Sequence, residues 1–128
     1  MSVKILIVED SSTTRAMITS AVEVIDGLEI FESNSGFEAL KLLPHHPFDL
    51  IITDINMPDI NGLELVSFVK KNQNYKHIPL IIITTEGSER DKEKGISLGA
   101  DEYLVKPFNP EELQRLVKKY LKIGKSIL

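Results

Sequence analysis

Acidic, hydroxyl and ammonium side chains stand at the ends of four apolar runs in this 128-residue chain. They are Glu9 and Asp10 after the first run, Asp54 after the third, Thr84 closing the fourth and Lys106 after the fifth. Three carboxylates gathered at one place repel one another, so such a cluster needs a cation. Oxygen ligands favour a hard ion, and Mg²⁺ commonly combines one or two carboxylates with phosphate oxygens. These residue types therefore predict a site for Mg²⁺ and a phosphoryl group.

Asp54 is the candidate nucleophile of this site. A carboxylate can attack phosphorus and form an acyl phosphate. The transfer then requires neutralisation of charge on the phosphoryl oxygens, which Mg²⁺, the Lys106 ammonium and the Thr84 hydroxyl can supply. Asp54 is favoured because the run before it is predicted to be a central strand, flanked by the strands that precede Asp10 and end at Thr84.

Five short apolar runs are the candidate strands that position these residues. They lack polar alternation, which is typical of strands buried on both faces of a parallel sheet. The runs are Val3 to Val8, Leu28 to Glu32, Phe48 to Thr53, Ile78 to Thr84 and Glu102 to Val105. Between them, apolar residues recur at helical spacing. The clearest stripes are Met17, Ile18, Ala21, Val22 and Ile25, and Leu113, Leu116, Val117, Tyr120 and Leu121.

This alternation predicts an α/β fold with a doubly wound, five-stranded parallel sheet of the flavodoxin-like type. Right-handed crossovers place helices on both faces, and the strand order 2-1-3-4-5 is common for five strands. Ligands bind such a sheet beyond the carboxyl ends of the strands, where the strand order reverses. Here that point lies between the first and third strands. Ser11 or Ser12 is predicted to cap the first helix, and Asn109 the last.

The composition narrows the classes of function. The chain has 15 Lys and Arg against 19 Asp and Glu, and this net charge of −4, without a basic block, argues against direct binding of nucleic acid. The absence of cysteine excludes disulfides and thiolate chemistry. The apolar runs are too short to span a bilayer. The first run begins at Val3, which leaves no room for a signal peptide, so we expect a cytoplasmic protein without membrane contact. We expect one domain, residues 1–122, followed by a tail or linker stub, residues 123–128.

Four segments resemble the signature segments of two-component response-regulator receiver domains. They are Val8-Glu9-Asp10, Thr53-Asp54-Ile55-Asn56-Met57-Pro58 followed by Asn61-Gly62, Ile83-Thr84-Thr85-Glu86, and Val105-Lys106-Pro107-Phe108. All four occur in the family's order at predicted strand ends, and the resemblance covers Val3 to about Leu121. The segment Asp10 to Arg15 is most similar to the chemotaxis-type (CheY-like) branch. The resemblance implies a CheY-like (βα)5 fold and a single-domain response regulator.

The resemblance also implies a role for each matching residue around the acceptor. Asp54 would accept a phosphoryl group from a sensor histidine kinase, a histidine phosphotransfer protein or a small phosphodonor. Asp10, the Asp54 carboxylate and the backbone carbonyl of Asn56 would bind Mg²⁺, with Glu9 acting mainly through water. The side chains of Asn56 and Glu86 would tune hydrolysis of the acyl phosphate, so we expect a fairly short-lived phosphorylated state.

Thr84, Lys106 and Tyr103 match the family's residues for signal propagation. Thr84 and Lys106 would bind phosphoryl oxygens, and the Lys106–Pro107 bond would be cis. Tyr103 would turn inward when Thr84 moves toward the phosphate. The output partner would bind the face formed by the charged helix Ser88 to Leu98, the strand Glu102 to Val105 and the last helix. The resemblance thus implies a switch rather than an enzyme with an external substrate, acting through protein contacts as a monomer or a phosphorylation-dependent dimer.

Two other functions fit parts of the sequence. Ser11 to Thr14 could hold an FMN phosphate at a helix N-terminus, as in a flavodoxin-like electron carrier. The chain has no Trp, and that function would leave Asp54 and Lys106 without a role. A phosphatase could use Asp54 as its nucleophile, but that mechanism would require a second acidic residue at the position of Asn56. A phosphorylation-activated switch is the function that uses all of the residues at the predicted strand ends.

Overall fold

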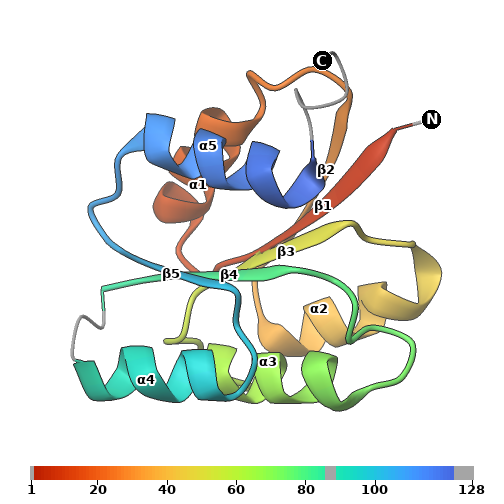
Figure 1. Ribbon diagram of the computed structural model, residues 1–128, viewed down its shortest axis with the longest axis vertical. Coiled ribbons are helices and arrows are strands. Elements are labelled where there is room, and N and C mark those ends of the chain that lie inside the picture. Colours follow the sequence, from red (N-terminus) through yellow and green to blue (C-terminus); the bar gives the residue numbers. More distant parts are fainter. Residues whose placement is uncertain (1, 86–88, 123–128) are drawn as a thin grey trace.

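Five β-α units make up the computed structural model, which describes residues 2–85 and 89–122 (Figure 1). The strands are β1 (Val3–Val8), β2 (Leu28–Ser33), β3 (Leu50–Thr53), β4 (Leu80–Thr84) and β5 (Glu102–Val105). The helices are α1 (Ser12–Val22), α2 (Gly36–Leu42), α3 (Gly62–Lys71), α4 (Glu89–Ser97) and α5 (Pro110–Leu121), with a short 3₁₀ helix, η1 (Leu43–His45), after α2. The predicted tail, residues 123–128, lies outside the described residues.

The five strands form one parallel sheet in the order β2-β1-β3-β4-β5, which confirms the predicted topology. β1 lies between β2 and β3, so the strand order reverses between β1 and β3, as predicted. In the register, Val8 is paired with Thr53, and Thr84 with Val105. Because neighbouring parallel strands end at the same edge, the residues that follow them are brought together there.

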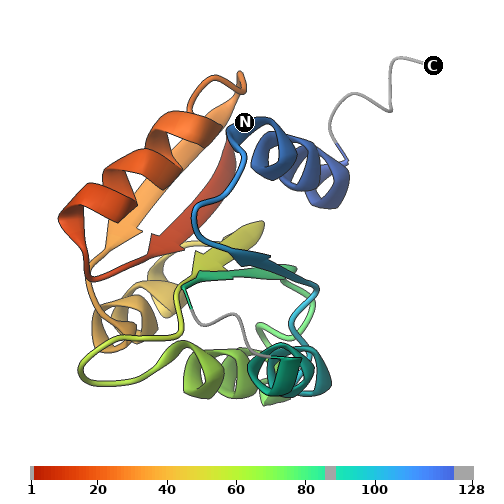
Figure 2. The same ribbon diagram turned by 90° about the vertical axis from the view of Figure 1, so that its left-hand side faces the viewer.

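Helices cover both faces of the sheet, with α1 and α5 on one side and α2, α3 and α4 on the other (Figures 1 and 2). Each face has its own apolar core because alternate residues of a strand point to opposite sides. From β1, Leu6 and Val8 pack toward α2 and α3, whereas Ile5 and Ile7 pack toward α1 and α5. This double burial explains why the strand sequences show no polar alternation.

Polar caps start the helices that flank the site. The Ser11 side chain accepts a hydrogen bond from Thr14 N at 3.2 Å, so Ser11 rather than Ser12 caps α1. Asn109 caps α5, as predicted. Asn61 and Glu64 form a reciprocal capping box at the start of α3. These caps fix where the loops end and the helices begin.

Four details of the apolar pattern were predicted incorrectly. β2 ends at Ser33 rather than Glu32, β3 begins at Leu50 rather than Phe48, and β4 begins at Leu80 rather than Ile78. Pro79 precedes β4 and has no N–H to donate to a ladder. Met17 does not face the core with the rest of its stripe, because its residue surface is 55% exposed. Among the described residues, no helix combines the length and apolarity needed to cross a membrane.

Candidate functional site

The carboxyl edge of the sheet brings together the polar residues predicted at the strand ends. Glu9 and Asp10 follow β1, Asp54 follows β3, Thr84 ends β4 and Lys106 follows β5. Glu9, Asp54 and Thr84 are 1%, 5% and 0% exposed, whereas Asp10 is exposed. Buried polar groups are costly unless they are paired, so this edge is a site whose contacts must be accounted for.

Lys106 links two of the buried carboxylates. Its Nζ lies 2.8 Å from Glu9 Oε1 and 3.2 Å from Asp54 Oδ2. Burial raises the pKa of Glu9, and the hydrogen bond from Lys106 offsets only part of that effect. Burial alone would lower the pKa of Lys106, but the hydrogen bond with Glu9 and the nearby Asp54 charge raise it. The ammonium is therefore held in its charged form between two acids.

The acidic residues Glu9, Asp10 and Asp54 each offer a carboxylate oxygen, and these oxygens lie within 4.8 Å of one another. One lysine cannot neutralise three carboxylates, so the cluster retains net negative charge. Hard oxygen donors at this spacing suit Mg²⁺ in both ligand type and charge. The donor set therefore fits the predicted metal.

The loop after β1 is held by contacts to its backbone. Glu9 Oε2 accepts a hydrogen bond from Ser11 N at 3.2 Å. The Arg15 guanidinium donates to the Glu9 carbonyl at 2.8 Å and to Glu32 of β2 at 3.0 Å. Arg15 was not singled out from the sequence, because a single arginine in a predicted helix carries no signal of which loop it will reach.

The loop after β3 is closed tightly against the acceptor. Asp54 N donates to Val8 O at 3.0 Å, and Gly62 N donates to Ile55 O at 2.8 Å. A Cβ on Gly62 would run into the backbone carbonyl of Asp54. Gly62 is therefore required by the backbone, since only a residue without a side chain allows α3 to start this close to β3.

The segment after β5 carries Lys106 into the site. Lys106 N donates to Thr84 O at 2.9 Å, which extends the pairing of β4 and β5 by one residue. The Lys106–Pro107 peptide bond is cis, as the resemblance implied. Tyr103 lies in β5, is half-buried, and has its ring 3.7 Å from the position that a Cβ on Gly95 of α4 would take.

The remaining predicted residues differ in where they lie. Asn56 follows Asp54 by two residues and is exposed on the loop at the rim of the site. Glu86, predicted to tune hydrolysis, lies outside the described residues, as does Ser88, the predicted first residue of the charged helix.

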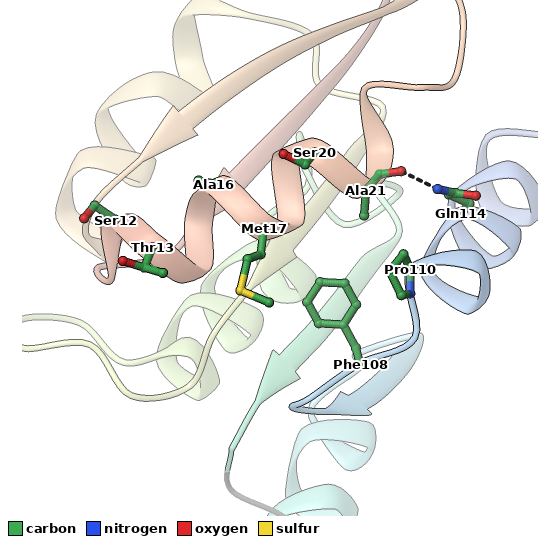
Figure 3. Close-up of a pocket in the computed structure, with 9 residues that line it drawn as sticks. All are labelled: Ser12, Thr13, Ala16, Met17, Ser20, Ala21, Phe108, Pro110 and Gln114. Atoms are coloured by element: carbon green, nitrogen blue, oxygen red, sulfur yellow. Dashed lines mark hydrogen bonds between the residues drawn. The ribbon is translucent and has the colours of Figure 1, made fainter.

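A groove of about 740 Å³, lined by uncharged residues, lies between α1 and the start of α5 (Figure 3). Met17 of α1 faces Phe108 and Pro110 in this groove, and Gln114 of α5 donates a hydrogen bond to Ala21 O at 2.8 Å (Figure 3). A smaller cavity of about 290 Å³ shares Met17 and Phe108 and reaches Lys106. The exposed side chain of Met17 thus lines a surface that adjoins the site.

Comparison with known proteins gives one consistent result. The sequence model of one protein family, described as the response regulator receiver domain, matches residues 5–118. A chemotaxis protein CheY homolog of Campylobacter jejuni is 37% identical over 122 residues, which cover 94% of each chain. The solved structure of the chemotaxis response regulator CheY4 of Vibrio cholerae has a TM-score of 0.84 at 38% identity and covers 94% of this chain and 99% of its own.

The chain also matches part of longer proteins. It is 38% identical over 121 residues to the probable transcriptional regulator ycf29 of Pyropia yezoensis and spans 54% of the length of that relative. These matches give no support to an FMN electron carrier. From its fold, its carboxyl-edge residues and these matches, the chain belongs to the response regulator receiver domain family.

Proposed function

We propose that Asp54 is the phospho-acceptor of a two-component switch and takes its phosphoryl group from a sensor histidine kinase or a histidine phosphotransfer protein. Receiver domains are phosphorylation-activated switches, and that general function applies to this chain. The observation that carries the residue assignment is the convergence of Asp54, Glu9, Asp10 and Lys106 at one edge. Asp54 is the central member, since it contacts Lys106 and belongs to the acidic cluster.

The proposed transfer is a single displacement at phosphorus. A carboxylate oxygen of Asp54 forms the new P–O bond while the P–N bond of the phosphohistidine breaks, and the imidazole nitrogen leaves with the electron pair. Lys106, already 3.2 Å from Asp54 Oδ2, turns its ammonium toward the phosphoryl oxygens. The Thr84 hydroxyl, at the end of the neighbouring strand, binds another of these oxygens.

Mg²⁺ is the proposed cofactor of this step. Asp10, Asp54 and the backbone carbonyl of Asn56 would hold it, with Glu9 in support. When bound, it supplies positive charge against the phosphoryl oxygens. We assign the side chains of Asn56 and Glu86 to the rate of hydrolysis of the acyl phosphate. The only chemistry proposed is this self-phosphorylation and self-dephosphorylation, without an external substrate.

The proposed output runs from Thr84 to the face formed by α4, β5 and α5. Phosphorylation can favour an active conformer only by interacting better with that conformer than with the inactive one. Movement of Thr84 toward the phosphate would let Tyr103 turn inward between β5 and α4. This face exposes Ile96 of α4 and Val105 of β5, which are 44% and 46% exposed. The output partner, or a second copy in a phosphorylation-dependent dimer, would bind there.

Phosphorylation by a small donor tests the acceptor assignment. We expect incubation with acetyl phosphate and Mg²⁺ to add one phosphoryl group by intact-mass measurement, with an adduct that is labile at high pH. The adduct should be absent without Mg²⁺ and in Asp54→Asn. Asp49→Asn is the matched control, because Asp49 precedes β3 at its other end and accepts from Lys4 N at 2.9 Å. An unchanged wild-type mass, under conditions that label another receiver, would contradict the proposal.

A further inference from the structure

The loop of residues 55–61, between β3 and α3, carries Asn56 past the acceptor. Its base is closed by the hydrogen bond from Gly62 N to Ile55 O and by the Asn61 cap of α3. Those contacts fix the two ends of the loop, and Met57, between them, packs against the core on the α2 and α3 face of the sheet. Contacts made by the outer side of the loop add to these in setting the position of the Asn56 backbone.

The outer side of this loop is tied to the first turn of α2. Asp59 Oδ2 accepts a hydrogen bond from the backbone N–H of Phe37 at 2.9 Å. Independently, Ile60 O would lie 2.5 Å from a Cβ on Gly36, so the two backbones approach where Gly36 has no side chain. The N–H groups of Ile60 and Phe37 hold the pKa of the Asp59 carboxyl below its usual range.

The Asp59 contact is distinct from the cap of α2. Ser35 is the N-cap, and its side chain accepts from Glu38 N at 3.1 Å. Asp59 comes from another part of the chain, 22 residues from Phe37. Ser35 satisfies only one of the free N–H groups in the first turn, and Asp59 satisfies another from a distant part of the chain, so the bond adds to the capping of α2 and also joins the loop to it.

We propose that Asp59 is a positioning residue of the phosphorylation site, acting through the loop backbone on Asn56. This inference rests on the proposed function, in which the Asn56 carbonyl binds Mg²⁺ and its side chain tunes hydrolysis. Asp59 stands three residues from Asn56 and contacts neither the acceptor nor the metal ligands among its described hydrogen bonds. Its carboxylate ties the loop to the first turn of α2 and so restrains the backbone that carries Asn56.

Mg²⁺ binding by three variants tests this role. We expect Asp59→Ala to weaken Mg²⁺ binding about three- to tenfold. This is less than the roughly 10–100-fold loss of metal affinity typical when a group that hydrogen-bonds a metal-binding residue is removed. Asp59→Asn should restore it, because an amide oxygen can still accept from Phe37 N. Ser35→Ala is the matched control, since it removes a hydrogen bond from the same turn of α2 without touching the loop. Titration of the ¹⁵N-labelled proteins with MgCl₂, followed by NMR, gives the affinities.

Hydrogen exchange and phosphoryl lifetime complete the test. In Asp59→Ala, the Asn56 and Met57 amides should exchange faster, and the acyl phosphate lifetime should change at least twofold, while Ser35→Ala matches the wild type in both. Wild-type Mg²⁺ affinity in Asp59→Ala, or an equal loss in Ser35→Ala, would overturn the role of Asp59. A wild-type protein that binds Mg²⁺ but accepts no phosphate would instead overturn the proposed function, and the Mg²⁺ affinities would still decide the role of Asp59.

Discussion

Lys106 shows how one residue can balance the charge of the site before any phosphate arrives. Its ammonium lies within 3.2 Å of both Glu9 and Asp54, which are almost fully buried. The two carboxylates share one positive charge, so removal of the Lys106 ammonium would leave buried negative charge uncompensated. In the proposed mechanism the same ammonium turns toward the phosphoryl oxygens. Lys106 thereby exchanges its contacts with Glu9 and Asp54 for contacts with the phosphoryl group.

Replacement of Lys106 by Met should destabilise the protein in buffer without divalent ions. Lys106→Met keeps most of the side-chain volume but leaves Glu9 and Asp54 without their cation, so we expect the free energy of unfolding to fall by about 2–3 kcal/mol. Urea denaturation followed by circular dichroism measures this. Addition of Glu9→Gln to the variant should recover part of the loss, because one of the two uncompensated charges is removed. A variant as stable as the wild type would show that the carboxylates do not depend on Lys106.

Tyr120 gives a residue-scale prediction for alkaline pH. Burial and the 2.7 Å hydrogen bond that its hydroxyl donates to Glu102 Oε2 raise the pKa of Tyr120 from an ordinary 10 to about 12. A raised folded-state pKa means that the added stability is fully present below pH 10 and is lost as pH rises through about 12. Absorbance titration at alkaline pH should therefore show a tyrosine step near 12 that Tyr120→Phe removes. If the variant keeps this step, Tyr120 does not produce it.

At the scale of elements, α4 is anchored less firmly than α3, although both cover the same face of the sheet. Within α4, whose residues 89–97 are all described, Gly95 is the one that is buried. In α3, by contrast, Leu65, Val66 and Val69 insert into the core. Ile96, one of the two large apolar residues of the charged segment, is 44% exposed. Weak burial of a helix lowers the cost of its local opening.

We therefore expect the amides of α4 to exchange with solvent at least about tenfold faster than those of α3. Hydrogen–deuterium exchange of the intact protein, read residue by residue by NMR, measures both helices in one sample. The comparison is internal, since the two helices have similar lengths and lie on the same side of the sheet. Equal protection of α3 and α4 would contradict the weak anchoring of α4.

At the scale of the whole molecule, the fold brings together residues that are far apart in the chain. Lys106 and Glu9 form an ion pair across 97 positions of sequence, and Lys106 and Asp54 across 52. The parallel sheet does this because all its strands end at one edge. Two separate cores, one on each face, anchor the strands, and the residues beyond the strand ends carry the polar groups.

The sequence alone determined the strands, their parallel order and the residues at their ends. Continuous apolar runs and capped helical stripes are local signals, and an α/β alternation leaves few topologies, so β2-β1-β3-β4-β5 was predictable. Strand starts were less predictable because Phe48 and Ile78 are apolar yet precede the ladder.

The tertiary structure decided which side chains meet across the fold. Three contacts depend on distances between separate loops. Lys106 pairs with Glu9 as well as Asp54, Arg15 donates to the Glu9 carbonyl, and Asp59 accepts from the first turn of α2. Met17 follows the apolar stripe of α1 but faces the groove beside α5. Periodicity predicts the face of a helix but does not say how far its neighbours extend, and charge pairing depends on the three-dimensional separation of atoms.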